Sequence, residues 1–481
     1  MAAFGITGIY AVPLLSGWLT AVLAGRLMFE IRPPLAPAAI ALTGLATPLC
    51  FYSQTFWDHT LATFLATAAS LILVRSRPGR AAALAIMAPL LLAAAMLRIE
   101  LLAFALAAVS TWIAGVIFKV RTQPEGRTPG RQVLSPAALT LCAILALLLV
   151  IVFVAAHRPR HSEILFQLPH ELRAGASKLY VLPRALRALL VNSRVSEGPL
   201  LPVQWEQAAL LAVMLLPVVA IVGVAWMDAL IGIPALVVLL GCAAYLTSMP
   251  PYRSLHGLVS VSPYVALAAF AWRPAWREWP LPLVTLLALT GFYLVFGLTA
   301  NLLTYVNSAG TLQNSLEWGP RYLLSAYPLM VVLSLAGVHS YYHSHQAAML
   351  RFLVVGLTLG MISVSVQLEV RGLHMLYYNR GTLARADEIL RADGPVVTDL
   401  WWLPSALADL FSTHEMFLVP ERSAVADWAV LAANHGVKSF WFASDEPAAP
   451  ANFGSPLVRK ADSVPRVFER LYLTQFVLEN E

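Results

Sequence analysis

Acidic side chains are scarce over most of this chain. Residues 1–370 contain only twelve Asp or Glu, in a 481-residue protein that is 59% hydrophobic and 12% charged. So little charge cannot cover a water-soluble surface, and a soluble globular protein is excluded. The net charge is +6 and its basic excess belongs to the apolar portion, so no nucleic-acid partner is expected.

Cysteine is also scarce. The three cysteines, Cys50, Cys142 and Cys242, lie in apolar stretches and far from C-x-x-C spacing. Neither a disulfide framework nor a zinc site is predicted. Phosphate-loop and serine-hydrolase motifs are absent as well, so the sequence does not predict those two classes of enzyme.

Apolar stretches of about 20 residues recur along residues 1–370, and this length suits a helix that crosses a membrane. They predict a mostly α fold, a polytopic transmembrane helix bundle of about twelve spans. The predicted spans are approximately 2–24, 34–52, 57–74, 81–97, 101–118, 135–156, 207–227, 229–247, 258–271, 280–300, 321–339 and 352–369.

Arg and Lys gather in alternate short loops, which predicts that those loops are cytoplasmic and that the protein is a multi-pass cell-membrane protein. The basic loop at 157–205 then falls on the outer side, where long loops are exempt from this rule. It has two interpretations: a solvated loop with an amphipathic helix on the membrane surface, or a basic and His-containing segment that meets an anionic lipid-linked substrate.

Residues 371–481 differ in composition, with 14 acidic and 10 basic residues. Short apolar runs at 395–402, 415–420 and 437–444 predict strands, and segments 386–393, 405–412 and 423–436 predict helices. This alternation predicts a small extracytoplasmic α/β domain on a parallel sheet, separate from the transmembrane domain 1–370. We expect it to be a packing or acceptor-docking cap rather than a catalytic domain.

Three short polar breaks on the predicted outer side could carry chemistry, because ionisable groups at membrane depth persist mainly where they serve a site. The first break holds Asp58 and His59. A carboxylate there can bind a divalent cation or orient a sugar hydroxyl, and His59 can add a ligand or a proton relay. The alternative is an ordinary helix N-terminus, where an acidic residue favours the dipole.

The second break holds Arg98 and Glu100, between two apolar helices. Residues two apart do not face each other on a straight helix, so a local break in the helix is predicted here. The alternative to a site is a self-neutralising pair at a turn.

The third break holds Glu317, Arg321 and Tyr322, with Gly319-Pro320 fixing the start of the next helix. A guanidinium held there can clamp a phosphate with two parallel hydrogen bonds, and the alternative is an arginine that snorkels to the interface. Arg253 and His256 give a weaker signal on the same side.

The segments YSQTFWDHTLATFL, LRIELL, HGLVSVSPYVALA and WGPRYLLSAYPL resemble the GT-C superfamily of membrane glycosyltransferases. Relatives include protein O-mannosyltransferases, the aminoarabinose transferase that modifies lipid A, and oligosaccharyltransferases. The resemblance implies a polyprenyl-phosphate sugar donor, a lipid, glycan or protein acceptor at the outer face, and contact with membrane lipids.

By this resemblance, Asp58 matches an acidic residue that binds metal, so Mg²⁺ or Mn²⁺ is the candidate cofactor, or that helps to place donor and acceptor. Arg321 matches the phosphate-contacting arginine, and Arg98 and Glu100 match a turn beside the cavity. Members of the superfamily carry their catalytic base on a first outer loop, behind one helix. The pattern of spans here begins with the second helix, so we expect the base ahead of Met1, or a truncated or non-catalytic relative, and assign no base.

Two other enzyme or transport classes stay open. An O-antigen ligase or polymerase would use outer-loop Arg and His, as in loop 157–205, but WGPRYLL disfavours it. A transporter or flippase of lipid-linked sugars should show internal repeats and charges at mid-membrane, and the sequence shows no repeat. A non-catalytic membrane scaffold is the remaining interpretation.

Overall fold

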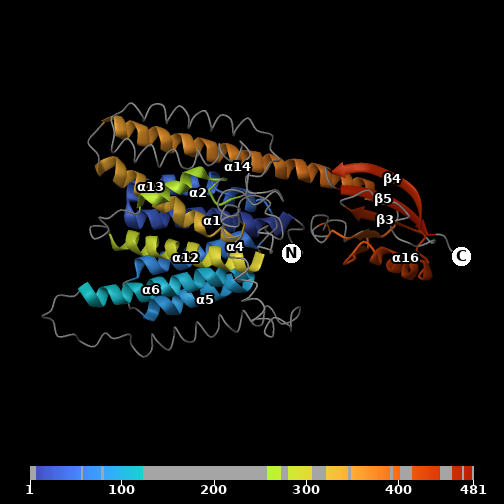
Figure 1. The fold of residues 1–481 in the computed structure, drawn as a ribbon, viewed down its shortest axis with the longest axis horizontal. Coiled ribbons are helices and arrows are strands. Elements are labelled where there is room, and N and C mark those ends of the chain that lie inside the picture. The colour runs from blue at the N-terminus through green and yellow to red at the C-terminus, as the bar shows by residue number, and fades with distance from the viewer. Residues whose placement is uncertain are drawn as a thin grey trace, which may run out of the picture. The chain divides into compact units, whose positions relative to one another are not determined.

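A computed structural model shows a mostly helical protein with a sheet near its C-terminus (Figure 1). The chain divides into two compact units, Met1–Gly372 and Leu373–Glu481. The structure describes residues 7–55, 58–76, 81–122, 257–259, 261–271, 280–305, 321–344, 348–390, 394–400, 403, 414–444, 458–468 and 471–478.

The described part of the first unit consists of helices that lie side by side with nearly parallel axes (Figure 1). The elements are α1 (Thr7–Ile31), η1 (Pro33–Leu35), α2 (Ala36–Leu45), α3 (Leu49–Tyr52), α4 (His59–Arg75), α5 (Ala81–Leu97), η2 (Ile99–Leu101), α6 (Leu102–Thr122), η4 (Pro263–Ala271), α12 (Leu281–Tyr305), η6 (Arg321–Leu323), α13 (Ala326–Ser344) and α14 (Ala348–Leu390). Here α denotes an α-helix and η a 3₁₀ helix.

Three segments in the described part of the chain are long and apolar enough to cross a membrane: Tyr10–Ile31, Ile99–Val116 and Leu350–His374. Shorter apolar helices accompany them, α2, α4, α5 and α12 among these. Exposed apolar side chains such as Trp18, Met96 and Phe352, 62–70% exposed, suit contact with lipid. The helical unit is therefore that of a membrane protein.

Two predicted spans are wrong as continuous helices. At 34–52 the chain is divided into η1, the ten-residue α2 and the four-residue α3. At 258–271 the structure has the 3₁₀ helix η4, nine residues long. A 3₁₀ helix rises about 2 Å per residue, so η4 is far shorter than the roughly 30 Å of a bilayer's hydrocarbon core. It packs against α13 instead. The predicted spans 135–156, 207–227 and 229–247 lie outside the described residues.

Backbone of η4 and α13 meets at Gly337. A Cβ built on Gly337 would lie 2.6 Å from the backbone nitrogen of Ala271, so a larger residue would need one of the two backbones to shift. Ser334 on the same helix donates a hydrogen bond to the carbonyl of Val265 at 3.2 Å. Close approach through small residues is how helices pack where lipid replaces water.

Local sequence explains where the helices end near the polar breaks. Pro48 lies directly before α3, at its N-cap position. Proline is tolerated at the start of a helix but disfavoured in its interior, so α3 begins here. Arg98 has an extended backbone (φ −142°, ψ 109°) between α5 and the 3₁₀ turn η2. The predicted break of the helix between Arg98 and Glu100 is confirmed.

The second unit contains a five-stranded sheet in the order β2-β1-β3-β5-β4 (Figure 1). Its elements are β1 (Val396–Thr398), β2 (Met416–Leu418), α16 (Ala424–Asn434), β3 (Ser439–Ser444), β4 (Val458–Phe468) and β5 (Leu471–Leu478). The pairs β1–β2 and β1–β3 are parallel, with Val397 opposite both Phe417 and Phe442. Predicted strands at 395–402, 415–420 and 437–444 are confirmed, and predicted helix 405–412 lies outside the described residues.

The three predicted strands pair in parallel as expected, but the sheet as a whole is mixed, because β5 pairs antiparallel with both β3 and β4. The sequence of β4, VRKADSVPRVF, is polar and contains a proline, as edge strands often do. It therefore lacks the apolar pattern by which β1, β2 and β3 were predicted, and β5 was not predicted either. The predicted helix end at Gly436 is confirmed, with φ +80° at that glycine.

An aromatic core holds this sheet to α16. Phe440 lies 4.9 Å from Trp428 of the helix and 5.5 Å from Phe476 of β5, measured between ring centroids. All of Phe440, Phe442 and Phe476 are fully buried. Burial of each such ring stabilises the fold by roughly 1.5–3 kcal/mol, so this core contributes substantially to the stability of the second unit.

Candidate functional site

Asp58 lies directly ahead of α4, at the N-cap position, yet its side chain makes no capping hydrogen bond. Its carboxylate Oδ1 instead accepts a hydrogen bond from Nη1 of Arg98, 3.4 Å away and forty residues further along the chain. An ordinary N-cap would bond to the backbone of its own helix. The Asp58 carboxylate therefore pairs with Arg98 rather than capping α4, and its place at the start of that helix also suits the helix dipole.

Arg98 holds two carboxylates at once. Besides Asp58, its Nη2 donates to Oε1 of Glu100 at 2.9 Å. The extended backbone of Arg98 and the 3₁₀ turn after it allow two residues so close in sequence to face each other. The Nε of Arg98 is buried and finds no acceptor in the part of the chain that the structure describes.

Aromatic rings lie beside the triad of charged residues formed by Asp58, Arg98 and Glu100. The guanidinium carbon of Arg98 lies 5.9 Å from the ring centroid of Tyr322, a distance that permits a cation–π interaction. His59 lies 6.5 Å from Tyr322 and 5.6 Å from Tyr52, between ring centroids. Tyr293 of α12 donates to the carbonyl of Tyr322 at 3.5 Å and so holds η6 against the bundle.

A pocket opens where these segments meet. Three parts of the chain line it: the start of α4, the break between α5 and α6, and η6 with the residues before α13. The lining residues are His59, Ala62, Thr63, Arg98, Glu100, Leu101, Tyr322, Leu324 and Ser325. Of the residues predicted from the sequence, His59, Arg98, Glu100 and Tyr322 line this pocket, and Asp58 is joined to it through its ion pair with Arg98.

The described triad is net negative, because two carboxylates share one guanidinium. Glu100 is nearly buried, with 8% of its side chain exposed, whereas 39% of the Asp58 side chain is exposed. Burial raises the pKa of Asp58 above its ordinary value, and the charge of Arg98 partly opposes this rise. Asp58 is thus the accessible carboxylate of the triad.

The described donors do not make a divalent-cation site. No group of three His, Cys, Asp or Glu able to hold a metal ion occurs among the described residues. Both carboxylates are also bonded to the guanidinium of Arg98, whose charge would repel a cation. Mg²⁺ or Mn²⁺ on Asp58 stays a prediction from the resemblance, and we derive no step through a metal ion.

Two polar pocket residues were not predicted. Ser325 donates to Thr63 at 3.2 Å and ties the residues before α13 to α4. Thr63 belongs to a row of buried polar side chains on α4, namely His59, Thr63, Thr67 and Ser70. That helical spacing in an apolar helix is visible in the sequence and would have indicated a face turned toward the bundle interior.

The structure gives less information about the other predicted site residues. Arg321 begins η6 directly before Tyr322, and only its backbone is described. Arg253, His256 and Glu317 lie outside the described residues, as does loop 157–205. The roles of all these residues stay predictions.

No model of a known protein family, no curated protein and no solved structure matches this chain.

Proposed function

We propose that this protein is a multi-pass membrane glycosyltransferase that moves a sugar from a polyprenyl-phosphate donor to an acceptor at the extracytoplasmic face. The observation that carries the proposal is the convergence of Arg98, Glu100 and Tyr322 in one pocket, with Asp58 paired to Arg98. Their segments are separated by long apolar stretches, so only a specific fold brings them together. Such polar groups at membrane depth are characteristic of a site.

In the proposed reaction, the acceptor hydroxyl attacks the anomeric carbon of the sugar while the bond from that carbon to the phosphate oxygen breaks. The leaving phosphate takes the electron pair, so positive charge must meet it. The described triad is net negative and would not attract a phosphate by itself. We therefore assign the phosphate to Arg321, the residue next to Tyr322 of the pocket.

The proton of the acceptor hydroxyl must pass to a base. Asp58 is the accessible carboxylate of the triad, and its raised pKa makes it a better proton acceptor than an ordinary aspartate. Glu100 holds Arg98 from the other side and so keeps the guanidinium in position beside Asp58. We propose Asp58 as the residue that contacts the acceptor hydroxyl and takes its proton, and Arg98 and Glu100 as positioning residues.

The twelve-span bundle and the outer position of the C-terminal unit belong to the same proposal. Apolar grooves between helices would hold the lipid tail of the donor, and the pocket would open on the side opposite the basic loops.

The decisive experiment is transfer of labelled sugar from polyprenyl-phosphate hexoses and pentoses, measured in membranes that contain the full chain. Arg321→Ala should abolish transfer and leave membrane insertion intact. Arg75→Ala is the matched control, because Arg75 lies in the last turn of α4, at the end of that helix away from Asp58. Equal transfer by Arg321→Ala and wild type would remove Arg321 from the phosphate role.

A transporter or flippase of lipid-linked sugars is the second candidate, favoured by Glu369. This residue is 1% exposed within Leu350–His374, a segment able to span the membrane. Buried carboxylates in such helices serve proton or ion pathways in transporters. Translocation of a fluorescent polyprenyl-phosphate sugar across proteoliposomes, without sugar transfer and with loss in Glu369→Gln, would favour this candidate over the transferase.

A further inference from the structure

One edge of the sheet in the second unit is formed by β2. Strand β2 comes first in the order β2-β1-β3-β5-β4, and among the described strands it pairs with β1 alone. The carbonyl of Glu415 accepts a hydrogen bond from β1 and the amide of Val419 donates one to β1, each at 2.9 Å. Because backbone groups alternate between the two sides of a strand, the amides and carbonyls of Met416 and Leu418 point away from β1.

The side chains of this edge strand are apolar and accessible. Phe417 is 37% exposed and Leu418 is 53% exposed. The ring of Phe417 lies 5.2 Å from that of Trp428 in α16, measured between centroids. Successive residues of a strand point to opposite faces of the sheet, so Leu418 lies on the face away from α16. Strand β2 can therefore be contacted on both faces as well as along its edge.

The opposite edge of the sheet, formed by β4, has a different character (Figure 1). Its sequence, VRKADSVPRVF, includes three basic residues and a proline. Charged side chains and proline on an edge strand protect it from pairing with another chain. The sequence of β2, MFL, contains neither. Of the two edges, only that of β2 keeps the properties that favour the addition of a strand.

Carboxylates flank this edge. Glu415 directly precedes β2 and Glu421 follows it by three residues, and both are exposed. Asp427, next to Trp428 in α16, is exposed as well. The nearby cation Arg422 lies 3.4 Å from Asp399, so its charge is already opposed by a carboxylate of its own. The surroundings of β2 therefore complement a positively charged partner.

We propose that β2 is the docking site for an extended, basic segment of a partner protein, which adds to the sheet as a further strand. Main-chain hydrogen bonds to Met416 and Leu418 hold the segment, and its alternate apolar side chains cover Phe417 and Leu418. Lys or Arg at the ends of the segment meet Glu415 and Glu421. The proposal concerns the second unit alone and does not depend on the proposed transferase reaction.

The test uses the purified full chain in detergent and the fluorescently labelled peptide KKVTVTVKK, with fluorescence anisotropy as readout. Leu418→Lys places a charge on the edge and removes an apolar contact, and should weaken binding at least tenfold. Val477→Lys is the matched control. Val477 of β5 is 39% exposed, but its strand is paired on both sides, with β3 and β4, so this variant should bind as wild type does.

Two further measurements separate strand addition from general attraction. Peptides N-methylated at one or the other set of alternate residues should differ at least tenfold in affinity, because only one set of amides faces β2. These peptides need no variant of the protein, so they decide the matter even where Leu418→Lys folds poorly. Glu415→Gln/Glu421→Gln should weaken binding about threefold and reduce its dependence on salt.

Lack of peptide binding by the wild-type chain would overturn the proposal, as would unchanged affinity in Leu418→Lys. Equal affinity of the two methylated peptides would do the same, because backbone pairing would then play no part. Light scattering gives the last outcome: a wild-type dimer that Leu418→Lys dissociates would show that a second copy of this chain occupies the edge, and would replace the proposed partner.

Discussion

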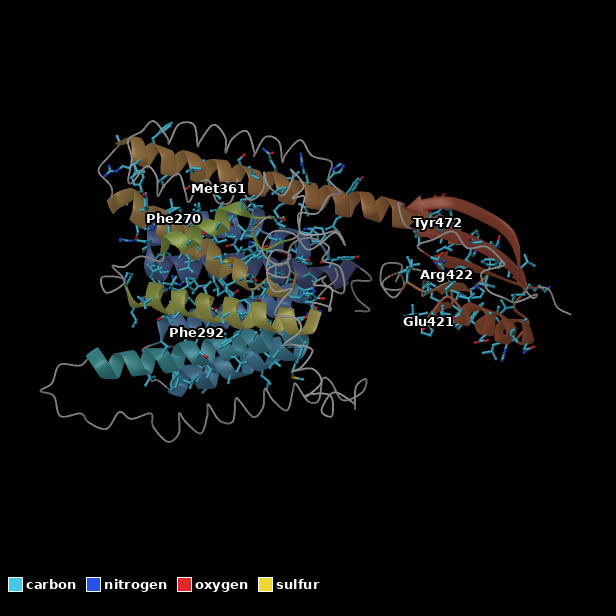
Figure 2. All side chains as sticks on the ribbon, viewed as in Figure 1. Phe270, Phe292, Met361, Glu421, Arg422 and Tyr472 are labelled. Carbon is cyan, nitrogen blue, oxygen red and sulfur yellow. The ribbon has the colours of Figure 1, made fainter. Side chains whose placement is uncertain are left out.

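The two units contain arginines in closely similar local geometry but different surroundings. Arg98 lies 3.4 Å from Asp58 and 5.9 Å from the Tyr322 ring, and Arg422 lies 3.4 Å from Asp399 and 5.9 Å from the Phe442 ring. Arg422 belongs to the sheet unit (Figure 2). Arg98 has a second carboxylate, Glu100, and lines a pocket, whereas Arg422 packs beside an aromatic core. The geometry of an ion pair alone therefore does not distinguish a functional site from an ion pair that only stabilises the fold.

Both units expose large apolar side chains, since Leu418 and Leu431 of the sheet unit are 53% and 61% exposed, but their cores are built differently. In the helical unit, Leu15, Trp18 and Leu359 are 58–62% exposed although they are large and hydrophobic. In the sheet unit the large aromatic residues Phe440, Phe442 and Phe476 are buried in one core. Lipid removes the drive to bury apolar side chains, so the helical unit depends on close packing and interhelical hydrogen bonds. Water imposes that drive on the sheet unit.

The largest predicted difference between the two arginines is catalytic. Arg98→Lys keeps the charge but loses the branched guanidinium that donates to both Asp58 and Glu100. It should therefore lower sugar transfer about 100-fold, as loss of a positioned polar group does in other enzymes. Arg422→Lys should leave transfer unchanged. Initial rates with a labelled donor measure both, and equal losses in the two variants would mean that Arg98 too only stabilises the fold.

A smaller effect is expected from the carboxylates. Asp58→Asn removes the proton acceptor but keeps the size of the side chain, and should lower turnover by about 10- to 100-fold. Asp399→Asn is the control in the second unit. The pH profile adds a readout that a structural role would not move: because the pKa of Asp58 is raised, the acidic limb of wild-type activity should lie above the pH expected for an ordinary aspartate. Full activity of Asp58→Asn would reduce Asp58 to a helix-end residue.

For the free energy of unfolding, we expect the larger effect at Arg422. Arg422→Ala leaves Asp399, whose side chain is 15% exposed, without its guanidinium partner and should lower the free energy of unfolding of the second unit by about 1–2 kcal/mol. Denaturant unfolding followed by Trp fluorescence measures this change. A stability loss below the detection limit, together with reduced transfer, would place Arg422 in the reaction and erase the contrast with Arg98.

The smallest expected effect concerns divalent cations. Because Arg98 already neutralises Asp58 and Glu100 in part, chelation with EDTA should change transfer less than about twofold. Rates with and without added Mg²⁺ or Mn²⁺ test this. Loss of activity on chelation, restored by Mg²⁺ or Mn²⁺, would show that Arg98 moves away from Asp58 to admit a metal ion.

The sequence predicted features that depend on neighbours along the chain. The break at Arg98 was predicted because two residues two positions apart cannot face each other on a straight helix. The apolar run after Asp58 predicted that a helix begins there. The hydrogen bond from Ser325 to Thr63 was not predictable, because 262 residues separate the partners. The β4–β5 pairing was missed for a related reason: the charged pattern of β4 makes sense only once its edge position is known.

The contact at Gly337 has an evolutionary consequence. With the backbone of η4 touching this glycine, even an alanine would have to displace a whole segment of main chain rather than a flexible side chain. Homologues that keep this arrangement should therefore keep glycine there, while neighbouring lipid-facing positions drift freely among apolar residues. A natural variant with a bulky residue at this position would reveal that its η4 segment sits elsewhere.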